Sequence, residues 1–242
     1  MLIEADLHCH SLASSHAYST VNEMAATAAK KGLKGFALTD HAPEMWDAPH
    51  IWHFHNLVIL PRKISGAVVF RGAEANVNSF EGTLDMTEDD LRALEWVVAS
   101  FHIQVIKPGS LEENTKAYIK TIENNKWIDA IGHCTTNRYP VDFEPIVKKC
   151  AECGKFIEIN ESSIIYKKGS RENSYTILKL CKKYGVQVVV NTDSHYCDLI
   201  GETSNAQQII SELDFPKKLI FNSDFDRVCE YISKRRNIDL KI

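Results

Sequence analysis

The stretch Asp6-Leu7-His8-Cys9-His10 closes an apolar run at 2–7 that is typical of a β-strand. Side chains alternate faces along a strand, so we expect His8 and His10 on one face and Leu7 and Cys9 on the other. Two imidazoles on one side of a strand end form half of a transition-metal site. Alone, this pattern is equally compatible with two ordinary histidines near a terminus. Other parts of the sequence are therefore needed to distinguish a metal site from two ordinary histidines.

Ligand-type residues also follow the other apolar runs of the chain. The runs at 36–38, 67–73, 96–101, 127–132 and 187–190 lead to His41, Glu74, His102, His133, and the pair Asp193 and His195. A further run at 156–159 ends in Asn160. Helical patterns lie between or after these runs, at 22–31, 112–124, 143–153, 172–184, 203–213 and 224–236. About seven strands alternating with helices indicate parallel βαβ units.

These units predict an α/β fold, a distorted (β/α)7 barrel that occupies residues 1–242 as a single domain. A chain of 242 residues is within the range of α/β barrels. An open, doubly wound sheet is the alternative, but its glycine-rich phosphate loop after the first strand is missing from the sequence. Ligand-type residues close six of the seven predicted strands, and barrel enzymes build their active sites at this end of the strands. The barrel is therefore the favoured fold.

Composition and charge argue against several classes of protein. Lys and Arg number 28 against 32 Asp and Glu, so the chain has no broad basic field and we expect no nucleic-acid partner. No apolar run approaches the ~20 residues that cross a bilayer, and a signal peptide is not recognisable. We therefore expect no membrane partner and a cytoplasmic protein. Seven scattered cysteines suit reduced thiols, and the pair Cys150 and Cys153 is expected on a helix surface without structural zinc.

The candidate metal ligands form one set of histidines and carboxylates. They are His8, His10, His16, His41, Glu74, His102, His133, Asp193 and His195. Imidazole and carboxylate ligands suit zinc, manganese or iron. Nine ligands are more than one tetrahedral site can use, so we expect two or three ions, with coordination positions left open for water and substrate. Glu74, with two oxygens, is the natural bridge between two ions. Asp6 and Asp40 precede ligand histidines and are expected to accept hydrogen bonds that fix the ring orientations.

Six motifs, in this order, resemble the PHP (polymerase and histidinol phosphatase) family of metal-dependent phosphoesterases. They are Asp6-Leu7-His8-Cys9-His10, Thr39-Asp40-His41, Gly72-Ala73-Glu74, Ser100-Phe101-His102, Ile131-Gly132-His133 and Thr192-Asp193-Ser194-His195. Two longer stretches, at 16–20 and 47–54, are similar to its YcdX-type phosphatase branch. The resemblance implies a trinuclear site, usually with zinc. It assigns His8, His10, Glu74 and Asp193 to the first ion, Glu74, His102 and His133 to the second, and His16, His41 and His195 to the third.

The expected function is hydrolysis of a small phosphomonoester by a metal-bound hydroxide. Three divalent ions, Zn²⁺ first and Mn²⁺ or Fe²⁺ as alternatives, can activate water and stabilise phosphoryl transfer without a covalent enzyme intermediate. Asp193 is expected to position the hydroxide, and His195 and Glu74 complete the expected catalytic residues. The cysteines form no Cys-x5-Arg phosphatase loop. The alternatives are a histidinol phosphatase, an amidohydrolase-type C–N hydrolase on a barrel, and a non-catalytic metal-binding scaffold domain. The resemblance also allows a homo-oligomer.

Loop residues outside this set have two interpretations each. His50, His53 and His55 could line the substrate pocket or belong to a packed aromatic loop. Arg71 could bind phosphate or form a helix-facing salt bridge, and Arg138 and Lys167 could bind phosphate or be simple surface cations. Asn160 and Ser163 could contact substrate, although a turn is the favoured interpretation.

Overall fold

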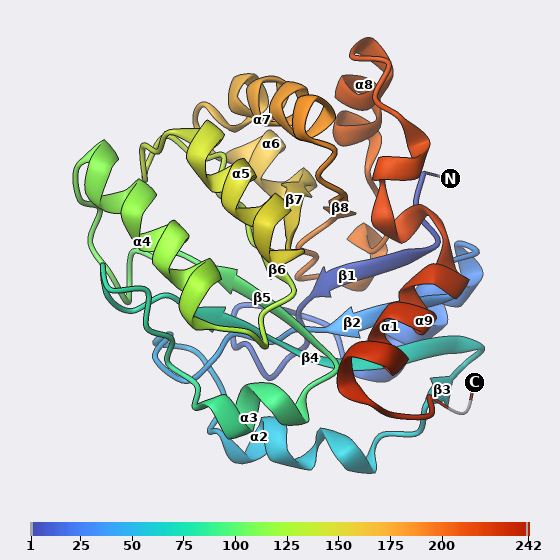
Figure 1. Ribbon diagram of the computed structural model, residues 1–242. Coiled ribbons are helices and arrows are strands. Elements are labelled where there is room, and N and C mark those ends of the chain that lie inside the picture. Colours follow the sequence, from blue (N-terminus) through green and yellow to red (C-terminus); the bar gives the residue numbers. More distant parts are fainter. Residues whose placement is uncertain (1, 241) are drawn as a thin grey trace.

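The computed structural model describes residues 2–240 and 242, which form a nearly closed barrel of parallel strands surrounded by helices (Figure 1). Neighbouring strands in the sheet follow the order β1, β2, β4, β5, β6, β7 and β8. Their bounds are Ala5–Cys9, Gly35–Leu38, Ala67–Asn76, Trp96–Ser100, Ala130–Ile131, Phe156–Asn160 and Val188–Asn191. The short strand β3, Lys63–Ile64, pairs antiparallel with the start of β4. The prediction of a distorted seven-stranded α/β barrel is confirmed.

Local sequence explains where the helices begin and end. Their bounds are α1 Val21–Lys30, α2 Trp52–Asn56, α3 Glu88–Ala93, α4 Leu111–Asn124, α5 Phe143–Cys153, α6 Glu161–Tyr166, α7 Ser170–Tyr184, α8 Ser204–Glu212 and α9 Phe225–Arg236. Thr20, Thr87 and Ser110 each begin a helix with a capping box. Gly154 ends α5 in the left-handed conformation, at the predicted position. Helix α6, which the sequence analysis does not anticipate, begins where the Asn160 side chain accepts the Ser163 N–H.

Alternate residues of the strands divide the core into two clusters. The inner cluster fills the barrel and includes Phe70, Trp96 and Val98, whereas the outer cluster packs the strands against the surrounding helices. Phe225 and Val228 of α9 belong to the inner cluster, together with residues from the first halves of the strands. Helix α9 therefore covers the N-terminal end of the barrel, and the polar inward side chains gather at the opposite end.

Strand β1 departs from regular alternation. Its pairing with β2 shifts register between Asp6 and Cys9. Leu7 belongs to the inner cluster and Cys9 to the outer one, so the prediction that they share one face is wrong. A bulge that adds one residue to a strand produces this change of face. Both His8 and His10 nevertheless lie within 4 Å of a Glu74 oxygen, at the C-terminal end of the barrel.

Side chains, more than backbone pairing, join β1 to β8. Among the described residues, the bridge between these two ends of the sheet is Cys9 with Ser194. The Asn191 Oδ1 accepts the Leu7 N–H at 3.0 Å. The Asn222 Nδ2 donates to the carbonyls of Ala5 and Val190 at 2.8 and 2.7 Å. Asp6 joins the same junction by accepting the Thr192 N–H, and this polar seam, formed by Asn191, Asn222 and Asp6, closes the barrel.

Two expectations from composition can be compared with the fold. All seven cysteines are free thiols, as their odd number and scattered spacing predict. Cys153 is exposed on α5, but Cys150 is fully buried, so the surface position predicted for the pair is wrong for Cys150. Helix α5 is amphipathic, and its Cys150 falls on the face that packs against the barrel. None of the helices in residues 2–240 combines the length and apolar character needed to traverse a membrane.

Candidate metal centre and active site

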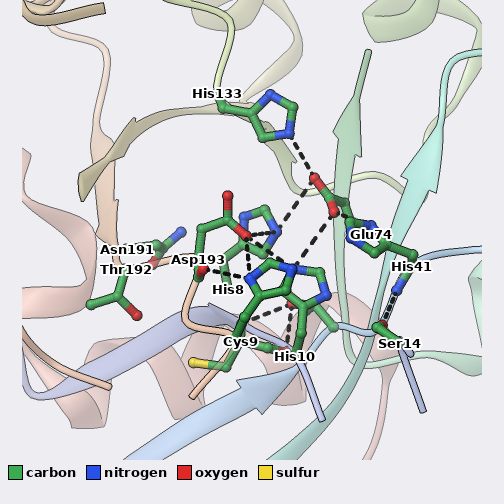
Figure 2. Close-up of polar contacts among 12 residues, drawn as sticks. His8, Cys9, His10, Ser14, His41, Glu74, His133, Asn191, Thr192 and Asp193 are labelled. Carbon is green, nitrogen blue, oxygen red and sulfur yellow. Dashed lines mark hydrogen bonds and ion pairs between the residues drawn. The ribbon is translucent and has the colours of Figure 1, made fainter. Parts of the chain in front are cut away.

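The C-terminal ends of the strands bring the nine predicted site residues to one face of the barrel. They are His8 on β1, His10 directly after β1, His16 in the following loop, His41 after β2, Glu74 on β4, His102 after β5, His133 after β6, and Asp193 and His195 after β8. Figure 2 shows side chains from several of these elements converging on the Glu74 carboxylate. Six of the nine are buried, His102 and His195 are half-buried, and His16 is exposed.

Glu74 lies at the centre of this cluster. Its Oε1 is 2.9 Å from His133 Nε2 and 3.4 Å from the Nε2 atoms of His8 and His102. Its Oε2 is 2.7 Å from His41 Nδ1 and 3.6 Å from His10 Nε2. The two oxygens of one carboxylate thus face different sets of imidazoles, as a carboxylate that bridges two ions requires.

Asp193 forms the opposite side of the cluster. Its Oδ1 lies 3.0 Å from His10 Nε2 and 3.6 Å from His8 Nε2. Its backbone has a φ of 56°, in the left-handed region, which costs a non-glycine residue on the order of 1–3 kcal/mol. The neighbouring Thr192 is held by the Asp6 carboxylate, which accepts its N–H and its hydroxyl at 3.1 and 2.5 Å. The seam therefore stabilises the conformation that points Asp193 at the histidines.

His16, His41 and His195 form the part of the cluster nearest to solvent. The ring centroids of His16 and His195 are 4.4 Å apart, and those of His16 and His41 are 5.1 Å apart. The His16 Nδ1 contacts the carboxylate of Asp47, a residue that the sequence analysis does not single out. The loop residue His16 is therefore fixed toward the strand-end residues although it lies outside the sheet.

The donor set fits divalent cations. The buried nitrogens His8 Nε2, His10 Nδ1, His41 Nε2 and His195 Nε2 have no hydrogen-bond partner. Within the described part of the chain, the ion pairs of Glu74 involve histidines and neither lysine nor arginine. Three groups of ligand atoms each lie within 4.8 Å of one another: His10, His41 and His195; His8, His10 and Asp193; His41, Glu74 and His102. Buried carboxylates and unpartnered imidazoles are costly, and divalent ions satisfy both.

Hydrogen bonds to three rings leave their Nε2 atoms free to bind a metal. The His8 Nδ1 donates to Glu158 Oε1 at 2.7 Å, the His102 Nδ1 to Asn76 Oδ1 at 2.7 Å, and the His195 Nδ1 to the Asp193 carbonyl at 2.9 Å. Partners of this kind fix the tautomer and orientation of ligand histidines. Glu158 and Asn76 are not among the residues predicted from the sequence. A signal existed for Glu158, because a carboxylate inside the buried run 156–159 needs polar partners.

The charges of the cluster also suit metal binding. Burial alone would raise the pKa of the Glu74 carboxyl, but the imidazoles of His102 and His8 hold it well below its usual range. Burial opposes ionisation of Asp193 as well, and His8 and His10 hold its pKa well below the usual range. Burial lowers the pKa of His102 to about 4, so this ring is neutral at physiological pH. Burial opposes a charge on His8, but Glu158 and Glu74 hold its pKa well above the usual range, so this ring has to release a proton when a metal ion binds.

The roles predicted for Asp6 and Asp40 are wrong. Asp6 accepts hydrogen bonds from Thr192 and from the Gly201 N–H, and it bonds neither neighbouring histidine. Asp40 accepts the N–H and hydroxyl of Ser11, the Ser14 hydroxyl and the His53 Nε2–H. Asp40 follows the end of β2, and its carboxylate is directed to Ser11, Ser14 and His53, none of which belongs to the cluster. Both carboxylates hold the loops around the cluster instead.

A pocket with a volume of about 1160 Å³ opens beside the cluster. His16, His41, His102, His133, Asp193 and His195 line its base, and Phe101, Tyr139, Ile165 and Tyr166 contribute to its walls. Arg138 and Lys167 line it as well, so the phosphate-binding interpretation of these two cations has the required location.

The other loop residues lie elsewhere. His53 and His55, both on α2, bond Asp40 and, at 2.7 Å, Asp90 of α3, so they fix this segment to its neighbours and the pocket-lining interpretation is wrong. His50 accepts the N–H of Trp52. The Arg71 guanidinium donates to the carbonyls of Val58 and Leu60 and stays outside the pocket.

Comparison with known proteins agrees with this geometry. A "Probable phosphatase" of Caldicellulosiruptor saccharolyticus is 44% identical over 232 residues, 96% of this chain and 97% of that protein. A "Probable phosphatase" of Acetivibrio thermocellus is 41% identical over 236 residues, 98% of each chain. The histidinol phosphate phosphatase of Lactococcus lactis, solved with zinc, L-histidinol and phosphate, shares the fold with a TM-score of 0.63 and 17% identity, covering 88% of this chain and 94% of that one. The PHP domain model matches residues 6–239, and the chain therefore belongs to the PHP domain family.

Proposed function

We propose that this PHP-family phosphatase hydrolyses small phosphomonoesters at a trinuclear site that holds three divalent ions, zinc being the first choice. The observation that carries the proposal is the group of buried, unpartnered imidazole nitrogens around Glu74 and Asp193 at the base of an open pocket. The relatives named as probable phosphatases support the reaction class.

The nine residues would hold the ions in the predicted division, with Glu74 shared between two of them. Divalent ions held there supply positive charge to the phosphate oxygens and lower the pKa of a water molecule toward ~7. Because His10 and His41 each belong to two of the ligand groups, the donor atoms form one continuous cluster. A phosphate that enters the pocket therefore meets all of these positions together.

The chain's own residues position the reacting groups. Asp193 has one oxygen 3.0 Å from His10 Nε2, and its other oxygen accepts from Asn160 Nδ2 at 3.2 Å, which fixes the carboxylate at the pocket base. There it can accept a hydrogen bond from the attacking water and orient it toward phosphorus. His195 lines the same pocket and, because its Nδ1 proton is bonded to the Asp193 carbonyl, presents an unprotonated Nε2.

The test is turnover of p-nitrophenyl phosphate by the zinc- or manganese-loaded protein. Asp193→Asn and His8→Ala are expected to lower kcat at least 10³-fold while circular dichroism stays unchanged, because each removes a group that acts as part of a unit. Asp198→Asn, an exposed carboxylate on the following loop, is the matched control and keeps full activity. Undiminished turnover in Asp193→Asn, or no turnover by the metal-loaded wild type on any phosphomonoester, contradicts the proposal.

A further inference from the structure

Three cations line the pocket without partners. They are Arg138, which is exposed, Lys167, which is half-buried, and Lys168, which is exposed. Among residues 2–240 and 242, none of these side chains has a recorded hydrogen bond or ion pair. Many other lysines and arginines of the chain do have carboxylate or carbonyl partners, for example Lys149 with Glu123 at 2.7 Å. Some exposed lysines in the described part of the chain, such as Lys179, are also unpaired, so what distinguishes these three cations is their shared position on the wall of the pocket.

The two loops that carry these cations are fixed against each other. The Asn137 N–H donates to the Lys168 carbonyl at 3.0 Å. The Asn173 Nδ2 donates to the Thr135 carbonyl and to Asn137 Oδ1 at 2.7 and 2.8 Å. Gly169 has a φ of 81°, and a Cβ there would lie 2.1 Å from the Asn137 side chain, so the loops meet where glycine alone fits. Arg138 and the two lysines therefore form one positive surface from segments about thirty residues apart.

Apart from Asp193 at the metal centre, the carboxylates that line the same pocket are bonded to groups other than these three cations. Glu161 accepts the N–H groups of Asn205 and Ala206 at 2.9 and 2.8 Å and the Asn205 side-chain amide at 2.8 Å, at the start of α8. Glu202 pairs with Lys31 at 2.6 Å. Both acids are thus already satisfied by groups of the protein. The cationic wall, defined as Arg138, Lys167 and Lys168, remains available to a ligand.

We propose that the natural substrates carry a second anionic group, a phosphate or a carboxylate, that binds to the cationic wall while the scissile phosphate lies at the metal centre. This inference rests on the proposed function and specifies its substrate class. A volume of about 1160 Å³ accommodates much more than one phosphate group, since whole small-molecule ligands occupy pockets of roughly 300–1,000 Å³. Arginine and lysine are the side chains that recognise phosphate and carboxylate.

The test compares kcat/KM within matched substrate pairs. Fructose 1,6-bisphosphate has one phosphate more than fructose 6-phosphate, and 3-phosphoglycerate has a carboxylate where glycerol 3-phosphate has a hydroxymethyl group. In at least one pair, the substrate with the additional anion is expected to be preferred at least tenfold, beyond the factor of two that arises from two phosphates. The pair that shows the preference identifies the anion. The absence of a preference in both pairs overturns the inference.

Variants then assign the preference to the wall. The triple variant Arg138→Gln, Lys167→Gln, Lys168→Gln is expected to lower the preference at least tenfold, through a higher KM for the substrate with the additional anion. Each single variant is expected to lower the preference by about fivefold or less. Lys179→Gln, which removes the same charge on an exposed position of α7 outside the pocket, keeps the preference. A triple variant that folds but loses equal activity on both members of a pair overturns the inference, as do single variants that leave the preference unchanged.

The two proposals fail in distinguishable ways. Wild-type protein that hydrolyses p-nitrophenyl phosphate but shows no preference refutes the second anion and leaves the phosphatase intact. Protein that hydrolyses no phosphate ester with any divalent metal refutes the phosphatase itself, and the inference falls with it.

Discussion

Replacing Glu158 with glutamine tests whether an outer carboxylate orders the metal centre. Glu158 is fully buried and accepts four hydrogen bonds. The donors are His8 Nδ1 at 2.7 Å, the His133 N–H at 2.7 Å, Asn160 Nδ2 at 3.0 Å and Asn191 Nδ2 at 2.9 Å. Glutamine has one accepting oxygen, so its amide NH₂ must face two of these donors.

Two orientations of the glutamine have different costs. If the NH₂ faces His133, the N–H of a residue whose φ is 25° loses its acceptor. If the NH₂ faces His8, the ring takes the other tautomer, and its Nε2 carries a proton where the lone pair should face the cluster. Leaving two buried donors unsatisfied costs about 1–3 kcal/mol each, so we expect Glu158→Gln to lower the unfolding free energy of metal-free protein by about 2–6 kcal/mol.

Metal affinity is the second quantity that the substitution changes. Loss of a partner that orients a ligand histidine lowers metal affinity or activity about 10–100-fold. The assay is zinc affinity by competition with a chromogenic chelator, together with metal content of the purified protein and urea unfolding in a chelator. Glu152→Gln, an exposed carboxylate on α5 that pairs with Lys149, is the matched control and should change neither quantity appreciably.

One outcome would falsify the reasoning for Glu158. It is a Glu158→Gln protein whose zinc affinity stays within twofold of the wild type while its stability falls, because the carboxylate would then support the fold without ordering His8. Equal stability of the two proteins in a chelator would show that the four hydrogen bonds are replaceable.

Three other predictions follow from features of the fold. Gly169→Ala should lower the unfolding free energy at least twice as much as Gly154→Ala, for which we expect a loss of about 1 kcal/mol. Both glycines have a positive φ, but only a Cβ at residue 169 would meet another side chain. Urea unfolding of the two variants measures both losses. Burial, aided by Arg235, lowers the pKa of Lys155 to about 8 from 10.5. Between these pH values the unfolded chain binds more protons than the folded one. The unfolding free energy of the wild type, relative to that of Lys155→Met, should therefore rise by about 3 kcal/mol from pH 8 to 10.5. A difference between the two proteins that does not change with pH contradicts this prediction. Removing metal with a chelator should lower Tm, and zinc at 100 times its Kd should restore about 2.7 kcal/mol for each independent ion, as read from thermal unfolding with and without zinc.

The sequence predicts the strands and their terminal ligands well because both have local signals. Buried parallel strands are continuous apolar runs, and the residue at the end of such a run, as with His102 or His133, is placed by the fold at a common rim. Capping residues and glycines likewise set the helix bounds. A six-residue helix such as α6 has no such periodicity, and only its capping Asn160 marks it.

The parts that the sequence does not predict depend on contacts between distant segments. Asp6 and Asp40 have the right spacing to orient histidines, but each carboxylate is directed to partners in other segments of the chain. Glu158 reaches His8 across 150 positions of sequence, which no local pattern reveals. The segment with His53 and His55 packs on Asp40 and Asp90, so its aromatic and histidine content reflects packing against its neighbours and not the pocket.

Ions bound at the metal centre would also strengthen the junction between β1 and β8, which the polar seam holds together. His8 lies on the first strand of the barrel and His10 directly after it, and Asp193 and His195 follow the last strand, so cations held by both sets would cross-link the two ends of the sheet. Closing a loop of more than 180 residues carries an entropy cost that a few side-chain hydrogen bonds only partly offset. Ion binding and the docking of the last strand onto the first would then be one cooperative event, in which the ligand completes the tertiary structure that binds it.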